Sequence, residues 1–197
     1  MSCGNPWRII AALCLLGLAQ RAGAFSLTQH QLAMPEGGFV PCQRVQLETN
    51  AFSFVPPAQW RLNVEAEKQK ITYQTLTRET TLSIQFTDKN SGAKSGTNSE
   101  KLRAELLERF PDAEVLESFP CYTNGGQGWA FDLVRTTGGQ FKTCIRIGFV
   151  PYEGGTVEFT LAALPDQFRQ QQLCFGALLT SFGSAPLPPS TVGSPAP

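Results

Sequence analysis

Four cysteines that follow the first 24 residues are the side chains best suited to covalent chemistry: Cys42, Cys121, Cys144 and Cys174. An even number of cysteines in an oxidising compartment predicts two disulfides, and the sequence leaves the three possible pairings open. No two of them form a Cys-x-x-Cys pair, which argues against a thioredoxin-like redox site and a zinc knuckle. Buried free thiols are the alternative, because an isolated cysteine often serves as a small core residue.

The chain has few side chains suited to acid–base catalysis, because His30 is its only histidine. It lies in a segment expected to be loosely structured, so neither a Ser-His-Asp arrangement nor a histidine-rich metal site is expected. Glu117 and Asp132 should fall on neighbouring strands, but a glycosidase needs two carboxyls facing each other across a cleft. We interpret them as solvated, with Asp132 pairing with Arg146 or Lys142 if a helix covers its face. The sequence therefore predicts no catalytic residue, no metal ligand and no cofactor.

Recognition of another protein is the function to which the aromatic residues are best suited. Trp60 follows a double proline near the expected end of a sheet, and Tyr122 and Tyr152 lie at loop margins. Amphipathic aromatic side chains at loops are typical of protein–protein contacts. The alternative is that at least one of the three belongs to the core.

The first 24 residues have the pattern of a cleaved signal peptide. Arg8 precedes an apolar run at 9–19, and Ala22-Gly23-Ala24 provides a small-x-small site, so cleavage is expected after Ala24. The run is shorter than the roughly 20 apolar residues that cross a bilayer. We expect a secreted or periplasmic protein with no transmembrane span in the mature chain. An uncleaved anchor is the alternative, because Arg21 lies close to the cut.

The composition is that of an ordinary globular protein, with 42% hydrophobic and 16% charged residues and equal numbers of basic and acidic side chains. Cleavage would remove two arginines and leave a net charge of about −2, which offers no basic surface for nucleic acid or an anionic membrane. The mature length fits one domain with tails. We divide it into a loosely structured lead-in segment at 25–50 with a short strand at 44–47, a domain at 51–183 and a Pro-rich tail at 184–197 that cannot repay its ordering entropy.

Hydrophobic periodicity predicts the elements that must position these residues. Two amphipathic helices are expected, one from Ser99, capped by Asn98 or Ser99 itself, and one capped by Asp166 and ended by Gly183. Asn124-Gly125-Gly126 and Thr137-Gly138-Gly139 indicate tight hairpin turns, the first in preference to a phosphate cradle. Strands are expected at 52–54, 71–75, 82–86, 115–121, 129–134, 141–149 and 157–161. Because tight turns join antiparallel strands, the predicted fold is α+β, an antiparallel sheet of about six to seven strands covered by two amphipathic helices.

That order resembles the PsbP-like fold, named for the extrinsic lumenal subunit of photosystem II and shared by many small exported bacterial proteins. Phe52-Ser53-Phe54-Val55-Pro56, followed by Trp60, is similar to the first strand of that family, and Leu179-Thr180-Ser181-Phe182 is similar to its closing helix. The resemblance covers about residues 50–183 and implies an α/β/α-type sandwich. Proteins of this fold act mostly in binding or assembly, although a fold does not fix a function. The four cysteines are not part of the family pattern.

These observations predict an exported, non-enzymatic binding or assembly factor whose partner is another exported or membrane-associated protein. The alternative is a small-ligand carrier or a carboxylate-based enzyme with a pocket between helix and sheet. A third class, redox sensing, would require an exposed cysteine with a low pKa.

Overall fold

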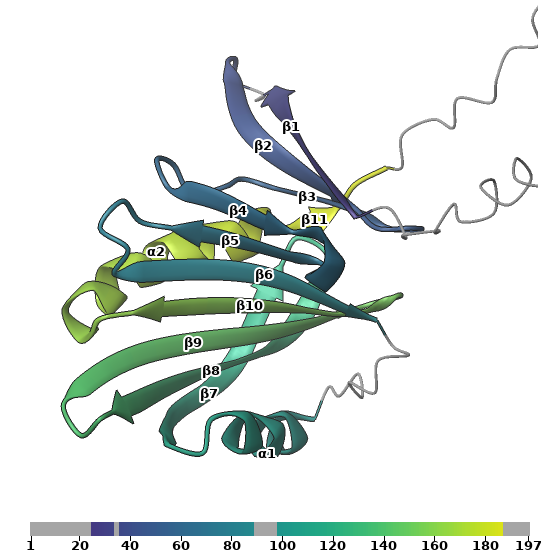
Figure 1. Cartoon of the computed structure of the whole chain (residues 1–197). Coiled ribbons are helices and arrows are strands. Elements are labelled where there is room, and N and C mark those ends of the chain that lie inside the picture. Colours follow the sequence, from purple (N-terminus) through teal and green to yellow (C-terminus); the bar gives the residue numbers. More distant parts are fainter. Residues whose placement is uncertain (1–24, 34–35, 89–97, 187–197) are drawn as a thin grey trace, which may run out of the picture.

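Two antiparallel sheets of unequal size form the fold (Figure 1). The computed structural model describes residues 25–33, 36–88 and 98–186. The larger sheet has seven strands in the order β4-β5-β6-β10-β9-β8-β7, and the smaller has four in the order β1-β2-β3-β11. The predicted signal peptide, and residues 187–197 of the predicted tail, lie outside the described residues.

All neighbouring strands of the larger sheet are antiparallel, as the sequence predicts. After β6 the chain passes through helix α1 to the far edge at β7 and returns strand by strand, so that β10 pairs with both β9 and β6. A 3-10 turn, η1 (Ala66–Lys68), joins β4 to β5. The strands are β4 (Arg61–Glu65), β5 (Lys70–Gln74), β6 (Thr80–Asp88), β7 (Ala113–Thr123), β8 (Gly126–Thr137), β9 (Phe141–Tyr152) and β10 (Gly155–Ala163).

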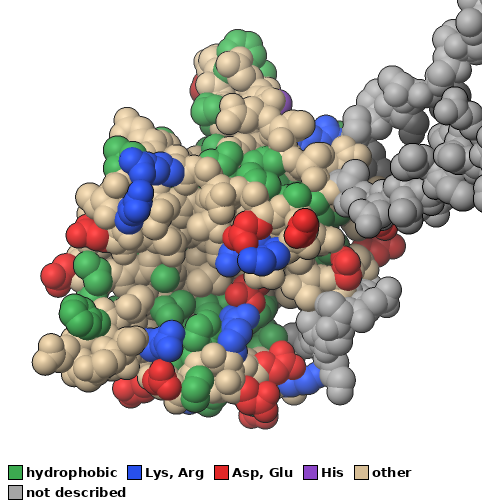
Figure 2. All heavy atoms as spheres, viewed as in Figure 1, with side chains coloured by type: hydrophobic (Ala, Val, Ile, Leu, Met, Phe, Trp, Pro, Cys, Tyr) green, Lys and Arg blue, Asp and Glu red, His purple; other side chains and the backbone are tan. Residues whose placement is uncertain are grey.

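The smaller sheet corrects the expectation of a loosely structured segment at 25–50. Its strands are β1 (Ser26–Ala33), β2 (Phe39–Gln46), β3 (Ala51–Phe54) and the two-residue β11 (Gly183–Ser184). Nearly all side chains of β1 are exposed, so the strand carries no apolar alternation that the sequence could reveal. Leu32 and Phe39 lie exposed towards the end of a β1–β2 hairpin that projects from the body, and Figure 2 shows hydrophobic side chains at its top.

One face of the larger sheet is covered jointly by helix α2 (Pro165–Ser181) and the smaller sheet. The buried α2 side chains are Phe175, Leu178 and Leu179, and Phe182 follows directly after the helix. The Phe52 ring of β3 stacks on Phe182 with centroids 5.1 Å apart and lies 5.5 Å from the Phe86 ring of β6, which joins the two sheets. Two sheets and a helix therefore share a single aromatic core.

The start of α2 differs from the predicted cap at Asp166. The N-cap residue is Leu164, which makes no side-chain cap hydrogen bond, and Pro165 occupies the first helical turn. Proline is favoured there, because the first amide groups of a helix have no partner within the helix and the fixed φ of proline suits the helix. Asp166 instead lies inside the first turn, where its charge opposes the helix dipole.

The opposite face of the larger sheet receives helix α1 (Ser99–Arg109). Leu102 and Leu106 pack there against buried residues of β8 and β9. The predicted cap is confirmed, since the Asn98 side chain accepts a hydrogen bond from the Glu100 amide at 2.9 Å. Side chains of β5 and β6 on this face are polar, and the partly exposed ones include Thr72, Ser83 and Gln85. The sheet is therefore not covered by two helices alone, because a second sheet and open surface complete its two faces.

No helix within residues 25–33, 36–88 and 98–186 is both long and apolar enough to cross a membrane.

Candidate functional site

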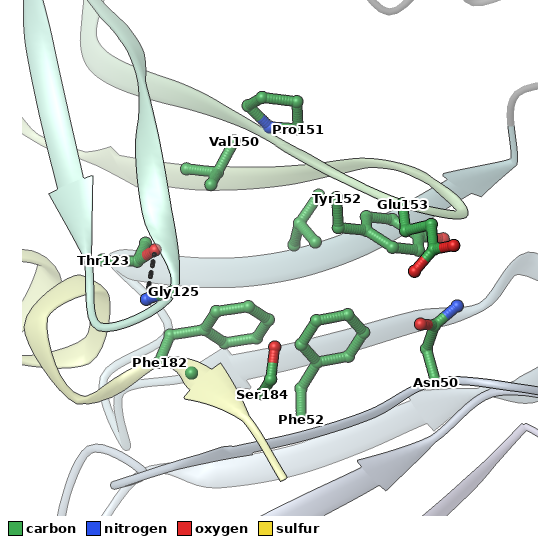
Figure 3. A pocket seen from close by; sticks show the side chains of 12 residues that line it. Asn50, Phe52, Thr123, Gly125, Val150, Pro151, Tyr152, Glu153, Phe182 and Ser184 are labelled. Atoms are coloured by element: carbon green, nitrogen blue, oxygen red, sulfur yellow. Dashed lines mark hydrogen bonds between the residues drawn. The ribbon is translucent and has the colours of Figure 1, made fainter.

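A hollow of about 180 Å³ lies where the two sheets meet, beside β11 (Figure 3). The turn between β7 and β8, the end of β9 and the strands β3 and β11 surround it. Its apolar lining consists of Phe52, Val150, Pro151, Tyr152, Val157 and Phe182. Its polar lining is formed by the side chains of Asn50, Thr123, Glu153 and Ser184. The hollow therefore combines aromatic rings with a polar rim.

Two glycines allow the β7–β8 turn to approach β11 closely. The Asn124 amide donates a hydrogen bond to the Phe182 carbonyl at 2.9 Å. A Cβ atom on Gly183 would lie only 3.2 Å from the Asn124 side chain, and one on Gly125 would contact the Ser184 amide at 3.6 Å. Gly183 was expected to end α2; the last helical residue is Ser181, and the C-cap residue Phe182 is extended. A side chain at 183 would crowd the Asn124 side chain, whereas one at 125 would make only ordinary van der Waals contact.

The turn itself is held by a threonine side chain. Thr123 Oγ1 accepts a hydrogen bond from the Gly125 amide at 3.3 Å and donates one to the Gly126 carbonyl at 3.1 Å. The predicted hairpin is confirmed. Gly138 and Gly139 in the other predicted turn have positive φ angles, whereas no glycine of this turn is among the described glycines with positive φ. The Thr123 hydroxyl therefore bridges the two sides of the turn, and the Thr123 side chain also lines the hollow.

Three aromatic rings meet at the base of the hollow. Phe52 stacks on Phe182 with an interplanar angle of 17°, and Tyr152 stands nearly perpendicular to Phe52 at 81°, with centroids 5.3 Å apart. Burial, and then the negative charge of Asp88, raise the pKa of Tyr152 to about 12. The Tyr152 hydroxyl therefore remains protonated at physiological pH and keeps its hydrogen-bond donor.

Of the three predicted contact residues, Tyr152 lines the hollow. Tyr122, which is 59% exposed, precedes Thr123 on β7, and because side chains alternate along a strand it faces the other side of the sheet. Trp60 directly precedes β4, at the end of the sheet opposite to the hollow. Arg61 pairs with Gln74, and this row of paired residues continues through β6 to the end of β10 that lies away from the hollow. Trp60 is half-buried against the core, in agreement with the alternative that one of the aromatics is a core residue.

The predicted disulfides are not formed, because all four cysteines are free thiols. They stand on four separate elements: Cys42 on β2, Cys121 on β7, Cys144 on β9 and Cys174 on α2. Burial raises the pKa of Cys121 to about 11, and burial together with the charge of Asp132 raises the pKa of Cys144. A raised pKa disfavours the reactive thiolate, so neither residue is suited to redox sensing.

The carboxylate singled out in the sequence is engaged in an ion pair. Arg146 Nε and Nη2 donate to the two Asp132 oxygens at 2.7 Å each, and the side chains are only 17% and 12% exposed. The guanidinium also lies over the rings of Phe119 and Phe168, at 4.8 and 5.9 Å from their centroids. The predicted partner Arg146 is confirmed, and the pairing leaves the Asp132 carboxylate poorly suited to general acid catalysis.

His30 lies on the exposed strand β1, where its Nε2 is 3.3 Å from the Ser53 hydroxyl. No carboxylate is recorded as orienting this ring, so the described contacts do not amount to a catalytic triad. In the described part of the chain, no three His, Cys, Asp or Glu side chains gather closely enough to hold a metal ion.

Sequence reasoning missed most of the residues that line the hollow. Asn50 and Ser184 lie at the boundaries of the predicted segments, Glu153 lies between two predicted strands, and Thr123 was not singled out. The one available signal was the position of Tyr152 beside a glycine-containing turn. Four separate chain segments meet at the hollow, so no local pattern could have revealed it.

Comparisons with known proteins identify solved structures with a similar fold. No protein-family model matches the chain, and no curated protein matches it. The solution structure of cyanobacterial PsbP (CyanoP) from Synechocystis sp. PCC 6803 is similar with a TM-score of 0.53 at 15% identity, covering 86% of this chain and 99% of that chain.

Two further solved structures are more distant. LpqN of Mycobacterium tuberculosis, described as involved in cell envelope biogenesis, gives a TM-score of 0.45 at 12% identity over 82% of this chain and 92% of its own. A protein of unknown function from Pseudomonas aeruginosa, described as a putative regulator, gives 0.44 at 12% identity over 81% and 98%. The similarity to cyanobacterial PsbP agrees with the resemblance found in the sequence, and at the level of fold this chain is PsbP-like.

Proposed function

We propose that this protein is an exported, non-enzymatic binding or assembly factor that receives a side chain of a partner protein in the hollow between its two sheets. The observation that carries the proposal is the size of the hollow together with its lining. Its volume of about 180 Å³ is well below the roughly 300–1,000 Å³ of sites for drug-sized ligands. A single side chain suits such a space better than a cofactor or a carried metabolite.

The surroundings of the hollow are typical of a protein interface. Aromatic rings at the base and polar groups at the rim match the arrangement in which a buried anchor is enclosed by a water-excluding border. This agrees with the sequence-based expectation that loops at one end of the sheet engage the partner.

The alternative function, an enzyme or carrier with a pocket between helix and sheet, has less support. The hollow lies between two sheets, and Asp132, the carboxylate considered for catalysis, is paired with Arg146 elsewhere on the sheet. We also infer export after cleavage at Ala24, from the pattern of the first 24 residues. The description of LpqN as a cell envelope biogenesis protein is consistent with that inference.

A tryptophan in place of Thr123 tests the proposal by filling the hollow. The matched control is Thr137→Trp, which adds the same ring at the exposed opposite end of β8. The full chain is expressed in its native host, crosslinked in place, and the captured proteins are quantified by mass spectrometry. We expect the wild type and Thr137→Trp to capture the same protein and Thr123→Trp to lose it, with an unchanged circular dichroism spectrum.

Equal capture by both variants would contradict the use of the hollow. The same sample reports the amino terminus of the captured chain itself. A chain that begins at Phe25 supports export, whereas one that still begins at Met1 contradicts it.

A further inference from the structure

The described residues that line the hollow carry one negative charge and no positive charge. Among the described residues that line it, Glu153 is the only charged one. Asp88 lies on the neighbouring strand opposite Gly155, and its negative charge reaches the Tyr152 ring, whose pKa it helps to raise. A site edged by one sign of charge attracts the opposite sign. The hollow therefore favours a cationic group.

The aromatic base of the hollow favours the same kind of group. A cation is attracted to the face of an aromatic ring within about 6 Å of its centroid. Phe52 is only 4% exposed and packs against Tyr152 in a nearly perpendicular arrangement, so the half-buried Tyr152 offers the accessible aromatic surface of the hollow. Figure 3 shows these rings and Phe182 around the centre of the hollow.

Hydrogen-bond acceptors at the rim distinguish among possible cations. The Asn50 amide nitrogen donates to Thr49 Oγ1 at 3.3 Å, and in Figure 3 its amide oxygen lies on the side of the Phe52 ring. The Ser184 hydroxyl points up between Phe52 and Phe182. With the Glu153 carboxylate, these acceptors lie apart from one another around the rim. A compact ammonium group with three rotatable donors fits separate acceptors better than the planar fork of a guanidinium.

We propose that the side chain received by the hollow is a lysine of the partner protein, with its ammonium group held by Glu153 and the rim acceptors and its methylene stem against the aromatic base. This inference rests on the proposed function, because it names the group that the hollow takes. Lysine suits the small volume, since its apolar stem packs on rings while its charge stays at the polar rim.

Three five-residue peptides test the inference: acetyl-Gly-Gly-Lys-Gly-Gly-amide, the same peptide with norleucine, and the same peptide with acetylated lysine. Binding to the full chain is followed by NMR chemical shifts. We expect saturable shifts at the hollow with the lysine peptide, and at least about tenfold weaker binding when the charge is removed. Glu153→Gln should weaken the lysine peptide by about two- to fivefold, the effect of one partly exposed charge pair.

The control variant is Glu114→Gln, which removes an exposed carboxylate towards the other end of β7 and should leave binding unchanged. Equal binding of the lysine and norleucine peptides, or equal effects of the two glutamine variants, would overturn the inference. That failure is distinguishable from failure of the proposed function. If Thr123→Trp still abolishes partner capture, the hollow is the binding site but its occupant is not lysine; if capture is unaffected, the proposed function itself fails.

Discussion

Removal of the Asp132 carboxylate is the most direct test of the ion pair that joins β8 and β9 beside α2. In Asp132→Ala, Arg146 loses both of its 2.7 Å hydrogen bonds while its guanidinium stays beside Phe119 and Phe168. The remaining positive charge has no other ion-pair partner recorded among the described residues. The loss of unfolding free energy in this variant thus measures the cost of a largely buried Arg146 charge that has lost its ion-pair partner.

The expected cost follows from how far water reaches the pair. Breaking a fully buried ion pair by removing one partner costs about 3–5 kcal/mol. Because the side chains of this pair are 12% and 17% exposed, we expect partial hydration of the freed arginine and a loss of about 2–3 kcal/mol. For a domain of this size that corresponds to a fall in Tm of about 4–12 °C.

Urea unfolding measures the loss as the shift in midpoint multiplied by the slope. The matched control is Asp112→Ala, which breaks the Arg135–Asp112 pair, where the side chains are 41% and 54% exposed. We expect that control to cost about 0–1 kcal/mol, as surface pairs do. Equal losses in the two variants would refute the reasoning that burial decides the strength of the pair.

Two smaller changes test other features of the fold. Asn98→Ala removes the side chain that caps α1 and should destabilise the protein by about 1 kcal/mol in urea unfolding. Ser99→Ala, one position later, should cost clearly less, and equal effects would show that the cap is unimportant. Because the folded-state pKa of Cys121 is raised from 9.0 to about 11, the folded state holds this proton more tightly than the unfolded chain. The stabilisation is fully present below pH 9 and is lost as pH rises towards 11, so the wild type should lose more stability over that range than Cys121→Ala; parallel curves would contradict this.

Local sequence patterns were sufficient wherever a structural preference is settled by neighbouring residues. The meander from β7 to β10 and the helix α1 follow from alternation, from the Asn98 cap and from the Gly138–Gly139 turn, all of which act within a few residues. The pairing of Asp132 with Arg146 was accessible for the same reason, because they lie opposite each other on strands joined by that turn.

Only part of the smaller sheet was accessible in this way, because the strand expected at 52–54 is β3. Its strand β1 is almost entirely exposed, and β11 has only two residues, so neither carries a hydrophobic period. The hydrogen-bond partner of β1 is the adjacent strand β2 of the same hairpin, whereas β11 exists because β3 supplies its partners from a distant part of the sequence. The cysteines illustrate the same limit, since their even number says nothing about the distances between the elements that carry them.

The sequence by itself therefore determined the α+β class, the antiparallel order and the pattern of an exported chain, since each rests on composition or on contacts between near neighbours. Only the tertiary structure decided where Asn50, Thr123, Tyr152, Glu153 and Ser184 meet. These residues come from segments separated by most of the chain, and the docking of β11 between β3 and the β7–β8 turn brings them together. Such a site depends on tertiary packing between distant segments, which no single stretch of the sequence determines.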